Sequence, residues 1–172
     1  MIKETKTMNQ QKKNNLGLVA YCLAQLGRPY WYGTFGQKAT PVLLSAKRRQ
    51  YPKYYTATDF ERQYAKRVHD CIGLIKGYFW SDNAEAKPVY LSNGFPDKSA
   101  DAFFDYCTRK GTRMDEMPDV PGVAVFMKGH VGVYIGDGWV IEARGHAYGV
   151  VMTKLKNRPW TKWAYIEGLQ YL

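Results

Sequence analysis

The stretch Gly129-His-Val-Gly-Val-Tyr-Ile-Gly-Asp-Gly-Trp-Val-Ile-Glu-Ala143 decides the fold class of this sequence. Two runs rich in branched and aromatic residues flank an Asp-Gly pair, which is typical of a hairpin turn between strands. Further runs of this kind predict additional strands: Val123–Met127, Gly149–Leu155 and Ala164–Tyr171. The C-terminal part is therefore predicted to form an antiparallel sheet.

The register of this hairpin decides whether His130 and Glu142 share a face of the sheet, because side chains alternate along a strand. A two-residue loop would pair Val133 with Glu142 and put Glu142 on the face opposite His130. A three-residue loop, Gly136–Gly138, would pair Gly132 with Glu142 and bring the two side chains to one face. We predict the second register, or one shifted by an even step.

The residues before the sheet have the patterns of helices. Asn14 or Asn15 can cap a first helix that ends at Gly27. Its apolar residues at i, i+3, i+4 and i+7 predict one buried face: Leu16, Val19, Ala20 and Leu23. A second helix is predicted from Cys71 to about Trp80, and a third from Ser99 to Lys110, with Phe103, Tyr106 and Cys107 pointing inward.

Helices followed by a sheet predict an α+β domain. A single domain is expected over residues 15–172, after a flexible polar tail at residues 1–14. Residues 34–57 have no clear period and are predicted to form a long surface loop. Thr58-Asp-Phe-Glu61 fits a capping box, which predicts the start of a short helix.

Composition excludes several classes of protein. With 45 % hydrophobic and 15 % aromatic residues, the 172-residue chain is too apolar for a disordered protein. Three cysteines without a close pair fit neither a disulfide framework nor a zinc knuckle. No stretch approaches the roughly 20 apolar residues of a membrane-spanning helix, and no signal peptide is recognised.

The formal net charge of +10 predicts attraction to a polyanion: nucleic acid, anionic membrane or anionic wall polymer. Charge alone does not choose among these three, and solubility is a further explanation. A specific nucleic-acid site would interleave aromatic and basic side chains. Only the short stretch Lys47-Arg-Arg-Gln-Tyr51 has that character, so no specific nucleic-acid partner is predicted.

Cys71 is a candidate nucleophile because Asp70 is a good N-cap, which would place Cys71 in a first helical turn. Free N–H groups and the helix dipole there favour a thiolate and would lower its pKa. The same N–H groups could hold an oxyanion. The alternative is a buried structural cysteine, which this fragment alone supports equally. Cys22 and Cys107 are expected to lie in or beside the core.

His130, at the start of a predicted strand, becomes a candidate general base when it is paired with Cys71. Glu142 lies within an otherwise apolar strand and needs a partner. An imidazolium would serve, so Glu142 is predicted to orient the His130 ring. His146 could take this role or contact substrate, although an exposed loop position is favoured. No spacing supports a metal site or cofactor, and His69 is predicted to have no role.

Three fragments together resemble the NlpC/P60 family of papain-like cysteine peptidases. They are Gly27-Arg-Pro-Tyr-Trp-Tyr-Gly33, Asp70-Cys-Ile-Gly-Leu74, and Pro121-Gly-Val-Ala-Val-Phe-Met127 followed by Gly129-His-Val-Gly-Val-Tyr-Ile-Gly136. The resemblance implies helices packed on an antiparallel sheet. It also implies hydrolysis of amide bonds in peptidoglycan stem peptides, often between γ-D-glutamate and a diamino acid.

By position, the resemblance makes Cys71 the nucleophile, His130 the base and Glu142 the third polar residue. Tyr30 would be an oxyanion or substrate contact, and Asp70 would help to hold a substrate amine. Two departures stand out: Ile72 replaces the usual serine, and the insertion around residues 34–69 is longer than usual. Without a wall-binding repeat, the basic surface is expected to bind anionic wall polymer.

The leading hypothesis is therefore a cell-wall cysteine peptidase, such as a phage or mobile-element lysin. Such an enzyme would be made in the cytoplasm without a signal peptide and reach the bacterial wall by release or another export route. A papain-like amidase or acyltransferase with the same Cys-His dyad is the first alternative. A non-enzymatic binding module is the second, and the joint presence of cysteine, histidine and acid argues against it. The sequence does not predict an oligomeric state.

Overall fold

The computed structural model describes residues 12–172, so the predicted tail at residues 1–14 lies mostly outside the described part. The helices of the described part are α1 (Asn15–Ala24), α2 (Pro41–Gln50), α3 (Gly73–Trp80) and α4 (Ala100–Tyr106). The strands are β1 (Phe35–Lys38), β2 (Arg67–His69), β3 (Lys110–Gly111), β4 (Ala124–Met127), β5 (His130–Gly136), β6 (Trp139–Ala143), β7 (Val150–Lys154) and β8 (Lys162–Ala164). No described helix is long and apolar enough to cross a membrane.

Six strands form an antiparallel sheet in the order β3-β8-β4-β5-β6-β7. Helices α1, α3 and α4 contribute buried residues to a core that they share with β4, β5 and β6. The predicted α+β fold, helices packed on an antiparallel sheet, is therefore confirmed. The last strand differs from its prediction: β8 is Lys162–Ala164, and the chain beyond Ala164 turns away to pack beside α1.

Helix α1 begins where the sequence predicts but buries a different face. Asn14 caps it, with its side chain accepting from the Gly17 N–H at 2.8 Å. Leu16 and Leu23 are 52 % and 44 % exposed, so the predicted face is wrong. The buried face carries Leu18, Tyr21 and Cys22.

Glycines on the two helices explain this choice of face. A Cβ on Gly77 of α3 would lie 2.3 Å from the Tyr21 hydroxyl oxygen. A Cβ on Gly17 of α1 would lie 2.3 Å from the Tyr78 hydroxyl oxygen. The two helices therefore approach through small residues and tyrosines, and this packing outweighs the spacing of the leucines.

Residues 34–57 do not form the predicted long loop, because the segment contains β1 and α2. Thr40 caps α2, accepting from the Leu43 N–H at 3.1 Å, and Pro41 fits the first helical turn. Strand β1 pairs with β2 across the insertion. Apolar side chains from this region form their own cluster: Trp31, Ala39, Leu44, Tyr55, Phe60 and Val68.

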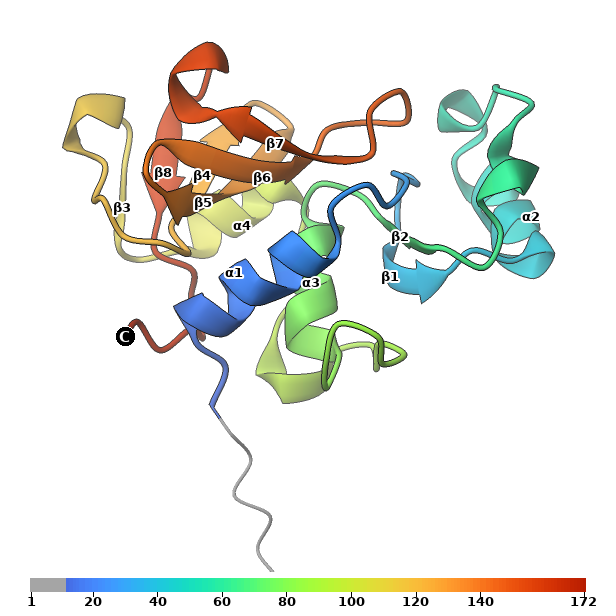
Figure 1. The fold of residues 1–172 in the computed structure, drawn as a ribbon, viewed down its shortest axis with the longest axis horizontal. Coiled ribbons are helices and arrows are strands. Elements are labelled where there is room, and N and C mark those ends of the chain that lie inside the picture. Colours follow the sequence, from blue (N-terminus) through green and yellow to red (C-terminus); the bar gives the residue numbers. More distant parts are fainter. Residues whose placement is uncertain (1–11) are drawn as a thin grey trace, which may run out of the picture.

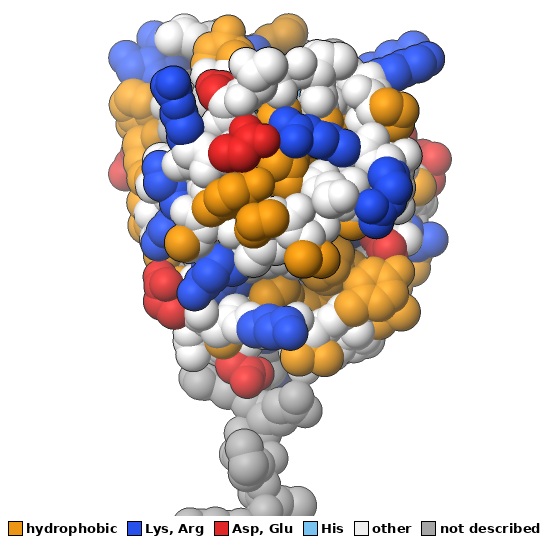
Figure 2. Space-filling model, turned by 90° about the vertical axis from the view of Figure 1, so that its right-hand side faces the viewer, with side chains coloured by type: hydrophobic (Ala, Val, Ile, Leu, Met, Phe, Trp, Pro, Cys, Tyr) orange, Lys and Arg blue, Asp and Glu red, His pale blue; other side chains and the backbone are white. Residues whose placement is uncertain are grey.

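Figure 1 places the insertion at one end of the molecule, with β3 at the opposite end. Viewed from the insertion end, basic side chains are spread over the surface, with acidic and hydrophobic ones between them (Figure 2). The capping box at Thr58 does not start an α-helix. Only a 3₁₀ turn forms at Phe60–Gln63, and Ala65 then takes a φ of 69°, which prevents helical continuation.

The other two predicted helices exist with shorter bounds. Helix α3 begins at Gly73, two residues after Cys71, and reaches Trp80. Helix α4 is capped by Ser99 and ends at Tyr106, because the chain turns extended at Cys107 and enters β3. Phe103 and Cys107 are buried as predicted, whereas Tyr106 is 46 % exposed.

The β5–β6 hairpin has the two-residue loop of one sequence alternative and the strand register of the other. Gly136 pairs with Trp139, so the loop holds two residues, Asp137 and Gly138, and the predicted three-residue loop is wrong. A bulge between Tyr134 and Gly136 then shifts the pairing by one residue, so that Val133 faces Ile141. Continued along the strands, this register sets Gly132 opposite Glu142 and puts His130 and Glu142 on one face.

Candidate active site

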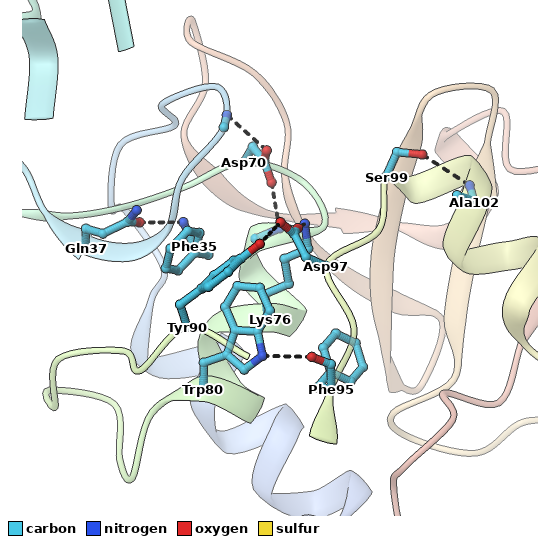
Figure 3. Close-up of polar contacts among 12 residues, drawn as sticks. Phe35, Gln37, Asp70, Lys76, Trp80, Tyr90, Phe95, Asp97, Ser99 and Ala102 are labelled. Atoms are coloured by element: carbon cyan, nitrogen blue, oxygen red, sulfur yellow. Dashed lines mark hydrogen bonds and ion pairs between the residues drawn. The ribbon is translucent and has the colours of Figure 1, made fainter. Parts of the chain in front are cut away.

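The segment around Cys71 is fixed to the N-terminal loop through Asp70. The Asp70 carboxylate accepts from the Gly33 N–H at 3.0 Å and from the Gly73 N–H at 2.6 Å (Figure 3). A Cβ on Gly73 would lie 1.9 Å from the Thr34 carbonyl oxygen, so only glycine allows this approach. The predicted capping role of Asp70 is thus present, although α3 itself starts at Gly73 with Ile72 at its N-cap.

Cys71 is half-buried and lies against the turn that precedes β5. Its Sγ is 3.9 Å from the Gly129 carbonyl oxygen. Burial, together with the nearby charge of Asp70, raises the pKa of the Cys71 thiol to about 12, although the N–H groups of Val131 and Ile72 favour the thiolate. The expected lowering of this pKa is therefore wrong, because desolvation outweighs the helix start.

The turn above Cys71 is held in place by α4. Met127 pairs with His130, which leaves Lys128 and Gly129 as a two-residue turn. The Gly129 N–H donates to the Asp101 Oδ1 at 2.8 Å, and its φ of 70° suits glycine. Asp101 was not predicted, since the sequence does not reveal that α4 meets this turn.

His130 and Glu142 form a hydrogen bond of 2.9 Å between Nε2 and Oε1. Glu142 is fully buried and also accepts from Thr153 Oγ1 at 2.6 Å and from Arg158 Nη2 at 2.8 Å. Burial alone would raise the pKa of Glu142, but hydrogen bonds from His130, Arg158 and Thr153 lower it to about 2. Glu142 is thus an ionised acceptor beside the imidazole.

Because Nε2 donates to an ionised carboxylate, this ring nitrogen carries the proton in the neutral imidazole. Nδ1 is then the nitrogen with a free lone pair, which is the arrangement that a general base requires. Arg158 and Thr153 were not predicted, because neither the pairing of β7 with β6 nor the turn after β7 is readable from the sequence.

Trp160 fixes the other side of the His130 ring. The two rings stack at a centroid distance of 5.5 Å and an interplanar angle of 12°. A Cβ on Gly132 would lie 2.7 Å from Val140 Cγ1 and 3.0 Å from the Trp160 ring. Gly132 therefore gives the indole room to lie on β5 beside His130. The close approach of Val140 and Trp160 thus explains why position 132 of the motif is a glycine.

Tyr30 and His146 meet at the edge of the site, with ring centroids 5.1 Å apart. Burial, with the nearby charges of Cys71 and Asp70, raises the pKa of Tyr30, so its hydroxyl stays protonated. His146 was predicted as an exposed loop residue. Instead its half-buried ring also contacts Tyr55 and Phe60 of the insertion.

His146 is therefore not beside Glu142 as an alternative orienting group. Neither of its ring nitrogens has a hydrogen-bond partner within the described residues, and burial lowers its pKa. His69 is buried, with Nε2 2.8 Å from the Tyr21 hydroxyl oxygen. Burial lowers the pKa of His69 to about 3.

The remaining cysteines lie in the core. Cys22 and Cys107 are 0 % and 2 % exposed, and burial raises the pKa of both thiols, that of Cys107 to about 11. Among residues 12–172, no group of three or more His, Cys, Asp or Glu side chains could hold a metal ion.

Comparison with known proteins decides the family. The NlpC/P60 family model matches residues 27–168, which includes Tyr30, Cys71, His130 and Glu142. The chain belongs to the NlpC/P60 family. No curated protein sequence matches it.

Solved structures of similar fold include other NlpC/P60 proteins. The peptidoglycan hydrolase RipB of Mycobacterium tuberculosis has a TM-score of 0.51 at 18 % identity, covering 89 % of this chain and 65 % of RipB. NlpC2 of Trichomonas vaginalis has a TM-score of 0.54 at 16 % identity, covering 91 % of this chain and 50 % of NlpC2. The P60 domain of antigen MAP1204 from M. avium subspecies paratuberculosis has a TM-score of 0.52 at 17 % identity, covering 91 % of this chain and 96 % of that domain. The chain thus spans about two thirds or less of the first two, and these identities support the fold alone.

Proposed function

We propose that this NlpC/P60 protein is a cysteine peptidase that hydrolyses amide bonds in peptidoglycan stem peptides. Cys71 is the nucleophile, His130 the general base and Glu142 the residue that orients the base. The observation that carries the proposal is the hydrogen bond between His130 Nε2 and the buried Glu142. His130 begins β5, and the turn before β5 lies against the Cys71 sulfur through the Gly129 carbonyl oxygen.

In the first step, Nδ1 of His130 takes the Cys71 proton as Sγ attacks the substrate carbonyl carbon. The high thiol pKa means that this transfer must accompany the attack, and Glu142 stabilises the imidazolium that forms. The oxyanion of the tetrahedral intermediate would accept a hydrogen bond from the protonated Tyr30 hydroxyl. His130 then protonates the leaving amine, which leaves an acyl group on Cys71.

In the second step, a water molecule loses its proton to His130 and attacks the acyl thioester. Sγ leaves as the thiolate and regains its proton from the imidazolium. The stem peptide is the expected substrate because the family acts on peptidoglycan, and RipB is itself described as a peptidoglycan hydrolase. The charge of +10 supports further attraction to anionic wall polymers, and release by a phage or mobile element is the proposed delivery route.

Digestion of purified peptidoglycan, followed by mass spectrometry of the fragments, tests this proposal. The wild-type protein should release peptides with new free amine and carboxyl ends, and Cys71→Ala should release none. Products joined to an added amine would instead favour the acyltransferase alternative. Equal release by both proteins would contradict the role of Cys71.

A further inference from the structure

The turn at residues 128–129 lies between the proposed nucleophile and the proposed base. Cys71 Sγ is 3.9 Å from the Gly129 carbonyl oxygen, and the Val131 N–H also favours its thiolate. These two backbone groups flank His130 in the chain, so the sulfur lies against the same strand start that carries the base. A shift of this turn would therefore move the His130 ring relative to Cys71.

The turn itself is open to solvent. Lys128 and Gly129 are both exposed, and the pair of Met127 with His130 closes the hairpin behind them. A Cβ on Gly129 would have no atom within 4 Å, so nothing packs against that side of the turn. The Gly129 N–H donates to Asp101 Oδ1 at 2.8 Å. The carboxylate of Asp101 is therefore the contact that ties this turn to a helix.

Helix α4 holds this carboxylate in a fixed place. Ser99 caps the helix, with its side chain accepting from the Ala102 N–H at 3.2 Å (Figure 3). Phe104, three residues after Asp101, lies on a neighbouring part of the helix surface. The buried Phe104 ring meets the Phe126 ring of β4 edge to face, with centroids 5.2 Å apart. The helix is thus packed on the strand that leads into the turn, and Asp101 joins the two.

The hydrogen bond from Gly129 to Asp101 contributes more to position than to stability. It is exposed, so water can replace it at a small cost in the free energy of unfolding. The geometry of reacting groups is more sensitive, because a displacement of about 1 Å can lower a rate by about a hundredfold. An aspartate in a first helical turn also stabilises its helix, but that role needs no contact with another element. The bond to Gly129 therefore indicates a function beyond the stability of α4.

We propose that Asp101 is a positioning residue, which holds the turn at residues 128–129, and with it the His130 ring, against Cys71. The inference rests on the proposed function, in which His130 takes the Cys71 proton. Asp101 acts as a hydrogen-bond acceptor through one oxygen, and its charge is not required. An amide oxygen at the same place can accept from the same N–H.

The test measures how fast iodoacetamide alkylates Cys71 at pH 7 in the full-length protein, mapped by mass spectrometry, which needs no substrate. Asp101→Ala should react about tenfold more slowly than wild type, because it loses the hydrogen bond that positions the base. Asp101→Asn should react within about twofold of wild type, because its amide oxygen can accept from Gly129. Asp105→Ala replaces another exposed aspartate of the same helix as the matched control, and it should react like wild type.

A second variant guards against misfolding of the first. Asp101→Ser suits a first helical turn but is too short to reach Gly129, so it should react as slowly as Asp101→Ala. Circular dichroism checks that each variant is folded. Equal rates in wild type and Asp101→Ala, an Asp101→Asn as slow as the alanine variant, an equal loss in Asp105→Ala, or no labelling of wild-type Cys71 would each overturn the positioning role. Peptidoglycan that stays intact with wild-type protein would contradict the proposed function alone.

Discussion

Replacing Glu142 by glutamine tests the proposed orienting role, and its effect on stability follows from the structure. The pKa of Glu142 falls from 4.5 to about 2 because hydrogen bonds from His130, Arg158 and Thr153 outweigh burial. At about 1.4 kcal/mol per pKa unit, this corresponds to roughly 3 kcal/mol of stability at neutral pH. Glu142→Gln should lose about this amount, since it leaves the Arg158 guanidinium, which is 18 % exposed, without a counter-charge.

A double variant separates this structural cost from catalysis. Glu142→Gln/Arg158→Met removes both charges and should recover much of the lost stability, because breaking one partner of a buried pair costs more than removing both. Its turnover should stay low, since His130 still lacks the carboxylate that stabilises its imidazolium. Urea unfolding followed by circular dichroism gives stability, and release of peptidoglycan fragments gives turnover. A double variant that is both stable and fully active would refute the orienting role.

Three further predictions concern stability and wall binding. Stability in urea should fall below about pH 6.5, since His69 must stay neutral when folded and its pKa is lowered to about 3. The fall should steepen below about pH 4.5, because the unfolded chain then binds a proton at Glu142 that the folded protein binds only near pH 2. A stability that is flat between pH 7 and 3 would contradict both assignments. Gly132→Ala should cost about 1–3 kcal/mol by overpacking against Val140 and Trp160, and urea unfolding measures this loss. Gly145→Ala is the comparison variant: no atom lies near its Cβ, so any loss of stability there comes from its φ of 131° and not from a clash. Wall binding in a pull-down should weaken as salt rises, since charges are screened over about 8 Å at physiological ionic strength; binding that is flat with salt would indicate a specific pocket.

The sheet and the motif residues were predictable because they depend on local patterns. The alternation in β5 and β6 predicts two strands, and the Asp-Gly pair predicts their turn. The face shared by His130 and Glu142 was predicted through the wrong loop length. A bulge at Ile135 restored the predicted register, and no local pattern distinguishes a bulge from a longer loop.

Features that depend on distant contacts were not predictable. The buried face of α1 is set by Gly77 and Tyr78 of α3, more than 50 residues away along the chain. Arg158 reaches Glu142 only because β7 pairs with β6 and the following turn folds back. The pKa of Cys71 depends on burial, which a helix-start pattern does not report. The Thr40-Pro41 pair was a readable signal for α2 that the lack of periodicity concealed.

The central claim is that His130 activates Cys71, and the pH dependence of cysteine alkylation tests it most directly. Iodoacetamide labelling of native protein, mapped by mass spectrometry, compares wild type with His130→Ala. Burial raises the pKa of the Cys71 thiol, so alkylation near neutral pH requires that His130 take the thiol proton as the sulfur attacks. The account predicts that wild type is labelled at Cys71 near neutral pH, with loss of activity, and that His130→Ala needs alkaline pH. Labelling of Cys22 or Cys107 first, with activity intact, or identical pH profiles for both proteins, would contradict it.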